Sequence, residues 1–160
     1  MRIFSGIQPT GRKHLGNYIG AITQYVAGQD RGDAIYCIVD LHAITVAFDP
    51  ADLRERTYDT AAILLAAGLD PARCILFRQS DVPEHTELTW LLCSVTELGR
   101  LQRMHQFRDK SLAQRELVSA ALLLYPCSPL QPLANQSLQR FQLGGGIVEQ
   151  MIARGGRGLT

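Results

Sequence analysis

The sequence lacks any long hydrophobic run. Its densest apolar stretches, residues 61–67 and 120–124, fall far short of the roughly 20 residues that a transmembrane helix needs. It also lacks an excess of either charge: 16 basic residues against 15 acidic ones leave a formal net charge of +1, so no whole-molecule field attracts nucleic acid or an anionic membrane. No apolar leader with a cleavage site opens the chain. These absences predict a cytoplasmic protein without a membrane partner.

Paired cysteines are absent as well. The four cysteines, Cys37, Cys74, Cys93 and Cys127, are widely spaced and form no C-x-x-C pair. Such spacing is typical of reduced thiols rather than of a zinc site or a disulfide framework. The sequence therefore predicts no protein-bound metal site.

What is present is the composition of one globular domain. The chain has 160 residues, 46% hydrophobic and 19% charged, enough to bury roughly 70% of the surface that the unfolded chain exposes. Short β-branched or aromatic runs alternate with helical patterns, which predicts an α/β fold: a Rossmann-like parallel sheet with flanking helices. The expected strands are 2–5, 34–39 and 74–77, and the expected helices are 15–27, one starting at Pro50 behind the N-cap Asp49, and 84–98.

Composition divides the chain at residue 126. From Cys127 onward it contains no Asp and no Lys, while Gln and Gly become frequent. We expect residues 1–126 to form a partial Rossmann-like nucleotide-binding domain, and residues 127–160 to be a divergent Gln- and Gly-rich tail compatible with flexible coil. Within the first part, Trp90 is interpreted as a packing residue on the apolar face of helix 84–98, and periodicity leaves residues 100–110 open between helix and loop.

A glycine-rich turn between the first strand and the first helix is the candidate phosphate-binding site. Gly6, Gly11 and Gly16 fall there, at the carboxyl end of a parallel strand, where nucleotides bind in open α/β sheets. Backbone N–H groups and the positive end of a helix dipole attract phosphate. His14 and Asn17, three residues apart at the helix start, can donate to the same phosphate. An ordinary turn with polar surface residues is the alternative interpretation.

Residues 6–20 resemble a known motif. The stretch Gly6-Ile-Gln-Pro-Thr-Gly-Arg-Lys-His-Leu-Gly-Asn-Tyr-Ile-Gly20 is similar to the first signature of the class I aminoacyl-tRNA synthetases, in the form found in the tryptophanyl-tRNA synthetase family. Asn17 stands where many members have a second histidine. Further similarity lies in residues 38–45, 76–80, 104–111 and 118–126, so the resemblance covers nearly all of residues 1–126.

The resemblance implies a tryptophan–tRNA ligase, which joins tryptophan to ATP with Mg²⁺, releases pyrophosphate and passes the tryptophanyl group to tRNA. It also implies a homodimer. The residues that it places along ATP are Gln8, Pro9, Thr10, Gly16 and Asn17; the catalytic ones near phosphate are His14, Asn17 and Lys110; those in the amino-acid pocket are Phe4, Gly6, Gln8, His42 and Tyr125. We expect His14 and His42 to face one cleft with Gln8. From the residues alone, a backbone-bonded His42 and a plain core Tyr125 remain alternatives.

The sequence departs from the family after Tyr125-Pro126. The family continues into a helix whose aspartate accepts the indole N–H, whereas this chain reads Cys127-Ser-Pro-Leu-Gln-Pro-Leu and has no aspartate after Asp109. The Lys-Met-Ser-Lys-Ser loop and the helical anticodon-binding domain are also absent. We therefore expect this chain to be inactive by itself. A truncated gene or a shifted reading frame is our hypothesis for the change, and the coding DNA tests it.

Two other functions stay open at this point. One is a small nucleotidyltransferase of the His-x-Gly-His type, which shares the phosphate chemistry but should carry histidine at position 17. The other is a non-catalytic fragment that binds nucleotide weakly, or that pairs with an intact subunit through residues 84–107.

Overall fold

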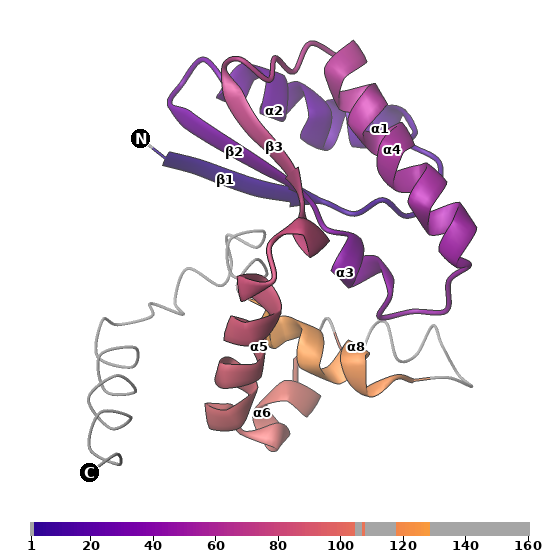
Figure 1. The fold of residues 1–160 in the computed structure, drawn as a ribbon, viewed down its shortest axis with the longest axis vertical. Helices are drawn as coiled ribbons and strands as arrows, with labels where there is room; N and C mark the ends of the chain where they lie inside the picture. Colours follow the sequence, from indigo (N-terminus) through magenta and orange to yellow (C-terminus); the bar gives the residue numbers. More distant parts are fainter. Residues whose placement is uncertain (1, 105–106, 108–117, 129–160) are drawn as a thin grey trace.

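Three parallel strands form the sheet of the described structure. The computed structural model describes residues 2–104, 107 and 118–128. Within them, β1 (Arg2–Ile7), β2 (Asp33–Ile38) and β3 (Cys74–Arg78) pair in the order β1-β2-β3, all parallel (Figure 1). The predicted parallel sheet and its three strands are confirmed, with bounds that differ by one or two residues.

The central strand β2 separates two apolar clusters, because successive side chains of a strand point to opposite faces. The larger cluster lies between the sheet and the helices α2 (Thr23–Gly28) and α4 (Pro50–Ala66) (Figure 1). Its strand residues are Ile7, Ala34, Tyr36, Ile38 and Cys74. The smaller cluster, on the opposite face, consists of Cys37, Val39, Phe4 and Phe77. Burial on both faces is what the continuous apolar run of β2 predicts.

The first helix follows the turn after β1. α1 (Leu15–Asn17), a π-helical turn (Tyr18–Ile22) and α2 form one continuous helical run. This confirms the helix predicted over residues 15–27. Ile22 and Tyr25 are buried and fix the run to the sheet.

The long helix α4 begins as the sequence predicts. The Asp49 carboxylate oxygen Oδ1 accepts the N–H groups of Ala51 at 2.8 Å and Asp52 at 3.0 Å, and Pro50 occupies the first helical position. These features satisfy backbone donors that have no partner inside the helix. Beyond the helix end, Gly68 has φ +108°, a conformation that favours glycine, and the chain turns toward β3.

The other helices lie beyond the carboxyl ends of β2 and β3. They are α3 (Asp40–Ala43), α5 (Glu84–Val95), α6 (Leu98–Gln102) and α8 (Ala120–Leu124), with 3₁₀ turns at Gln79–Asp81 and Tyr125–Cys127. α8 packs beside α6, and the turn Tyr125–Cys127 packs on α5 (Figure 1). α6 accounts for the start of the stretch 100–110 that the sequence left open. Residues 105–106 and 108–110 lie outside the described residues.

The predicted packing role of Trp90 is wrong for the described part of the chain. Its side chain is 73% exposed on α5. The reason is that α5 carries apolar residues on more sides than its neighbours cover, so that Leu88, Leu91 and Val95 are exposed as well. The helix thus presents exposed apolar side chains on more than one side within the described structure.

The predicted division of the chain at residue 126 stays a prediction, and the described structure continues two residues past it. Cys127 and Ser128 lie past it and are buried. The remainder of the predicted tail, residues 129–160, lies outside the described residues. Across the described part of the chain, no helix is both long enough and apolar enough to cross a membrane.

Candidate functional site

The loop after β1 is held by a lysine. The Lys13 ammonium donates to the backbone carbonyl of Gln8 at 2.7 Å and to that of Thr10 at 3.4 Å. Partial burial lowers the pKa of Lys13, and the nearby charge of Arg56 lowers it further. Gly11 has φ +64°, a left-handed conformation that favours glycine. The loop that the resemblance assigns to ATP is therefore held in its conformation by the hydrogen bonds that Lys13 donates to two carbonyl groups of the same loop.

His14 and Asn17 form a reciprocal cap at the start of α1. His14 Nδ1 accepts the N–H of Gly16 at 3.1 Å, and Asn17 Oδ1 accepts the N–H of His14 at 3.0 Å. The predicted position of these three residues at a helix start is confirmed. Because Nδ1 accepts, the proton of a neutral His14 ring lies on Nε2. The Nε2–H of His14 and the amide NH₂ of Asn17 are thus the groups that could donate to a phosphate.

Gly16 is small for a local reason. A Cβ at this position would lie 2.9 Å from Cε1 and 3.0 Å from Nδ1 of His14, because the imidazole folds back over the helix start to make its cap. A side chain at Gly16 would therefore displace His14. This local packing does not test the predicted contact of Gly16 with ATP, which stays a prediction.

His42 lies at the carboxyl end of the sheet, in α3, and is buried. Its Nδ1 lies 3.0 Å from Oε1 of Gln79, so the ring donates there. The His42 and Tyr125 rings form a T-shaped pair, with ring centroids 5.4 Å apart and an interplanar angle of 82°. Gln79 is fully buried and its Nε2 donates to Ser128 Oγ at 3.3 Å. Two residues predicted for the amino-acid pocket, His42 and Tyr125, are therefore in contact.

Gln79 and Ser128 were not predicted as site residues. Gln79 stands in the stretch 76–80 and follows β3 directly, and a polar residue just beyond a strand's carboxyl end is a signal that could have found it. Ser128 has no such signal, because its contact with Gln79 spans 49 residues of chain.

Phe4 and Gly6 lie on β1, in register with Ile35 and Cys37 of β2. The Phe4 ring is tilted against Phe77 with centroids 6.5 Å apart. A Cβ on Gly6 would lie 2.9 Å from Cγ1 of Val39. The absence of a side chain at Gly6 therefore leaves room for the Val39 side chain. Phe4 and Gly6 thus lie on β1, next to β2, and the chain continues from β2 into α3, which carries His42.

A pocket of about 190 Å³ lies beside the loop. Its lining residues are Pro9, Thr10, Ala43, Val46, Ala47, Phe48, Asp49, Asp52, Leu53 and Arg56. Two residues predicted to bind ATP, Pro9 and Thr10, contribute to it. The volume is below the 300–1,000 Å³ typical of ligand sites.

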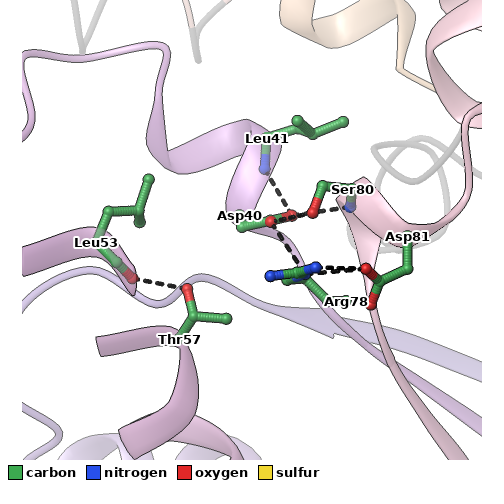
Figure 2. A network of polar contacts seen from close by, with 7 residues as sticks. All are labelled: Asp40, Leu41, Leu53, Thr57, Arg78, Ser80 and Asp81. Atoms are coloured by element: carbon green, nitrogen blue, oxygen red, sulfur yellow. Dashed lines mark hydrogen bonds and ion pairs between the residues drawn. The ribbon is translucent and has the colours of Figure 1, made fainter. Parts of the chain in front are cut away.

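A polar network joins the carboxyl ends of β2 and β3 (Figure 2). Asp40 accepts the N–H of Leu41 at 3.0 Å, the N–H of Ser80 at 3.0 Å and the hydroxyl of Ser80 at 2.6 Å. Arg78 Nε lies 3.8 Å from Asp40 Oδ2, and Arg78 also binds Asp81 at 2.5 Å. The network connects α3, which carries His42, to the turn that carries Gln79.

The predicted catalytic residue Lys110 lies outside the described residues. In the part of the chain that the structure describes, no group of three His, Cys, Asp or Glu side chains is arranged to hold a metal ion. The predicted convergence of His14, His42 and Gln8 on one cleft, and the roles of the predicted site residues, stay predictions.

Residues 1–139 match the family model of the class I tRNA synthetases for tryptophan and tyrosine. The chain belongs to this family. A tryptophan–tRNA ligase from Parasynechococcus marenigrum strain WH8102 is 47% identical over 161 residues, which cover 94% of this chain and 48% of the relative. One from Thermosynechococcus vestitus is 54% identical over 124 residues, 78% of this chain and 38% of the relative. The chain thus spans about half or less of the length of these curated relatives.

A solved structure of this family has a similar fold. The tryptophanyl-tRNA synthetase of Campylobacter jejuni, complexed with ADP and tryptophan, has a TM-score of 0.74 and 38% sequence identity, covering 79% of this chain and 40% of that one. A tyrosyl-tRNA synthetase from Archaeoglobus fulgidus, 21% identical with a TM-score of 0.65, shares the fold. The described sheet and helices therefore have the Rossmann-like architecture of class I synthetases.

The similarity extends past the predicted domain boundary at residue 126. The family match reaches residue 139, and the match to the Parasynechococcus relative includes 94% of this chain. That match has 161 aligned positions but covers only 94% of the 160 residues of this chain, so several positions of the relative have no counterpart here. The hypothesis of a shifted reading frame stays a prediction for the coding DNA to test.

Proposed function

We propose that this chain forms part of a tryptophan–tRNA ligase with ATP, tryptophan and tRNA as substrates. The observation that carries the proposal is the contact of His42 with Tyr125, whose ring centroids are 5.4 Å apart. It brings two distant segments of the chain together at the carboxyl end of the sheet, where ligands of open α/β sheets bind. The names of the matched relatives support the same substrate. Asn at position 17 disfavours the nucleotidyltransferase alternative, for which histidine is expected there.

The proposed reaction needs no protein nucleophile. In the first step a carboxylate oxygen of tryptophan attacks the α-phosphorus of ATP, the bond from that phosphorus to the bridging oxygen breaks, and pyrophosphate leaves. In the second step a ribose hydroxyl at the tRNA end attacks the carbonyl carbon of the adenylate, and AMP leaves. Mg²⁺ arrives with ATP. The protein's contribution is therefore to position the reactants and to stabilise charge.

The phosphate end of the proposed site is the loop and cap after β1. The Nε2–H of His14 and the amide of Asn17 would donate to phosphate oxygens at the start of the helical run, where the helix dipole favours an anion. Gln8, Pro9, Thr10 and Gly16 would lie along ATP, and Lys110 would add positive charge. The amino-acid end would consist of Phe4, Gly6, Gln8, His42 and Tyr125, whose aromatic rings offer stacking area to an indole.

Ligand binding tests the proposal without requiring turnover. Isothermal titration of the purified chain with tryptophan and with tyrosine should give binding of tryptophan. Tyr125→Ala should weaken that binding by about tenfold or more, since it removes the ring that contacts His42. Tyr58→Ala is the matched control, because Tyr58 is 60% exposed on α4, and should leave binding unchanged. Equal loss in both variants, or no tryptophan binding by the parent chain, contradicts the proposal.

We further propose a cytoplasmic homodimer. The cytoplasmic location follows from the tRNA substrate. The dimer is supported by the exposed apolar residues on α5 and at the start of α6, namely Leu88, Trp90, Leu91, Val95 and Leu98, since several large apolar side chains exposed along one short segment are typical of an interaction surface.

A further inference from the structure

Just beyond the last backbone pair of β2 and β3, a side chain connects the two chain segments. The parallel register pairs Ile38 of β2 with Arg78 of β3, so Asp40 and Ser80 stand two residues beyond the last pair on each strand. There Asp40 Oδ1 accepts the N–H of Ser80 at 3.0 Å and Oδ2 accepts its hydroxyl at 2.6 Å (Figure 2). The Asp40 carboxylate thus links the two segments where the backbone hydrogen bonds between β2 and β3 have ended.

The carboxylate of Asp40 is well satisfied in a sheltered place. Its side chain is 13% exposed, while that of Arg78 is 40% exposed. Besides the two bonds to Ser80, it accepts the N–H of Leu41 at 3.0 Å and lies 3.8 Å from Arg78 Nε. A partly buried carboxylate is costly unless it is hydrogen-bonded and paired. Its several bonds therefore tie two chain segments firmly together.

The two segments tied by Asp40 are those that carry the His42–Gln79 pair. Asp40 precedes His42 by two residues on α3, and Ser80 directly follows Gln79. The side chains of His42 and Gln79 meet at 3.0 Å in the buried interior. A shift of one segment against the other would lengthen this bond and change the orientation of the imidazole against the Tyr125 ring.

We propose that Asp40 is a positioning residue for the amino-acid pocket. By holding Ser80 it fixes the distance between His42 and Gln79, and with it the orientation of the His42 ring against Tyr125. Asp40 acts through these residues and does not touch the substrate. The part of this inference that concerns tryptophan rests on the proposed function; the part that concerns the His42 ring does not.

The first measurement is ¹⁵N NMR of the imidazole nitrogens in the full, ligand-free chain. The chain has four histidines, and the His42 signals are assigned by their loss in His42→Asn. Asp40→Asn and Ser80→Ala should each shift the Nδ1 resonance of His42, because both weaken the clamp. The matched control is Asp81→Ala, which removes the 2.5 Å bond between Arg78 and Asp81 but none of the bonds between Asp40 and Ser80, and should leave the resonance in place.

The second measurement is the dissociation constant for tryptophan and for ATP. Asp40→Asn and Ser80→Ala should weaken tryptophan binding by about tenfold, the scale of one lost hydrogen bond to a charged group, and should leave ATP binding unchanged. Ser80→Thr keeps the hydroxyl and should bind tryptophan as the parent chain does. A general loss of structure would instead weaken both ligands together.

The outcomes separate this inference from the proposed function. An unshifted His42 resonance in Ser80→Ala and Asp40→Asn, with both variants folded by circular dichroism, overturns the positioning role. A shifted resonance with unchanged tryptophan affinity overturns its link to the pocket. If the parent chain binds no tryptophan, the proposed function fails, while the resonance still decides whether Asp40 positions His42. Should Asp40→Asn not fold, Ser80→Ala removes one bond only and decides the matter.

Discussion

At the scale of single residues, Gly28 and Gly20 lie in one helical run but in different surroundings. A Cβ on Gly28 would overlap the hydroxyl oxygen of Tyr36. That hydroxyl donates to the carbonyl of Tyr25 at 2.8 Å, and the two tyrosine rings stack with centroids 4.6 Å apart. Around Gly20, nothing lies within 4 Å of an added Cβ. Gly28 is therefore required by packing, whereas Gly20 is not.

Gly28→Ala should lower the free energy of unfolding by about 1–3 kcal/mol, the usual cost of overpacking a core. Gly20→Ala should instead raise it by roughly 0.5–1 kcal/mol, since alanine loses less entropy than glycine in a helix. Urea denaturation of both variants measures these changes. In a double-mutant cycle, Tyr36→Phe should recover part of the Gly28→Ala loss by removing the hydroxyl. Simple additivity of the two losses would show that the overlap is not their cause.

The buried thiol of Cys37 makes stability depend on alkaline pH. Burial, and to a smaller extent the charge of Asp40, raises the pKa of Cys37 from 9.0 to about 12. Between these values the unfolded chain releases the thiol proton and the folded chain keeps it, so the free energy of unfolding falls as pH rises. Burial raises the pKa values of Tyr25, Tyr36 and Tyr125 as well.

Stability measured by urea denaturation should therefore decline from about pH 9 toward pH 12. Cys37→Ala should make this decline shallower, because up to one proton fewer is then released on unfolding. This change in slope is expected regardless of how the substitution changes the free energy of unfolding at neutral pH. A slope equal to that of the parent chain would mean that Cys37 ionises in the folded state as freely as in the unfolded one.

At the scale of elements, the stability of α4 depends on the hydrogen bonds at its first turn. Asp49 supplies the oxygen for two backbone N–H groups, and Pro50 fixes the first helical φ. Asp49→Ala should lower the free energy of unfolding by about 1 kcal/mol, within the range of 0.5–2 kcal/mol for a lost N-cap. Asp59→Ala, on the exposed side of the same helix, is the matched control and should change it by less than about 0.5 kcal/mol. Equal effects would contradict the capping role.

The elements that the sequence predicted well are those with local signals. A continuous apolar run marks β2, an Asp–Pro pair marks the start of α4, and His14 with Asn17 mark a helix start. Each signal acts within four residues of chain, which is the reach of caps and strand patterns. The contacts around Gln79 had no local signal, because its partners His42 and Ser128 are 37 and 49 residues away.

At the scale of the whole molecule, the exposed apolar side chains of α5 can be tested for a role in assembly. Trp90 is the sole tryptophan of the chain and is 73% exposed, so its fluorescence reports whether this side chain becomes buried on assembly. If the chain is a homodimer through α5, the emission should shift to shorter wavelength as concentration rises, in step with the mass measured by analytical ultracentrifugation. Trp90→Glu should give a monomer, and Tyr58→Glu, on exposed α4, a dimer. An unchanged dimer in Trp90→Glu would place the interface elsewhere.

Activity of the 160-residue chain is the second prediction at this scale. The 160 residues include no Lys-Met-Ser-Lys-Ser stretch and, after Asp109, no aspartate, so these residues by themselves do not supply the cationic loop or the indole acceptor that the resemblance implies. We expect no detectable tryptophan-dependent exchange of pyrophosphate into ATP by the chain alone. Exchange near the 1–100 s⁻¹ typical of phosphoryl-transfer enzymes, in protein free of full-length synthetase, would refute this expectation.

The sequence by itself determined the class of fold, because the strand and helix periods and the caps are encoded in neighbouring residues. It also placed His14, Gly16 and Asn17 at a helix start. The tertiary structure alone decided that Asp40 bonds to Ser80, that His42 bonds to Gln79 and that Trp90 is exposed on α5. These outcomes depend on the register between β2 and β3 and on which helices cover which face, and those are properties of the packed chain rather than of any local segment.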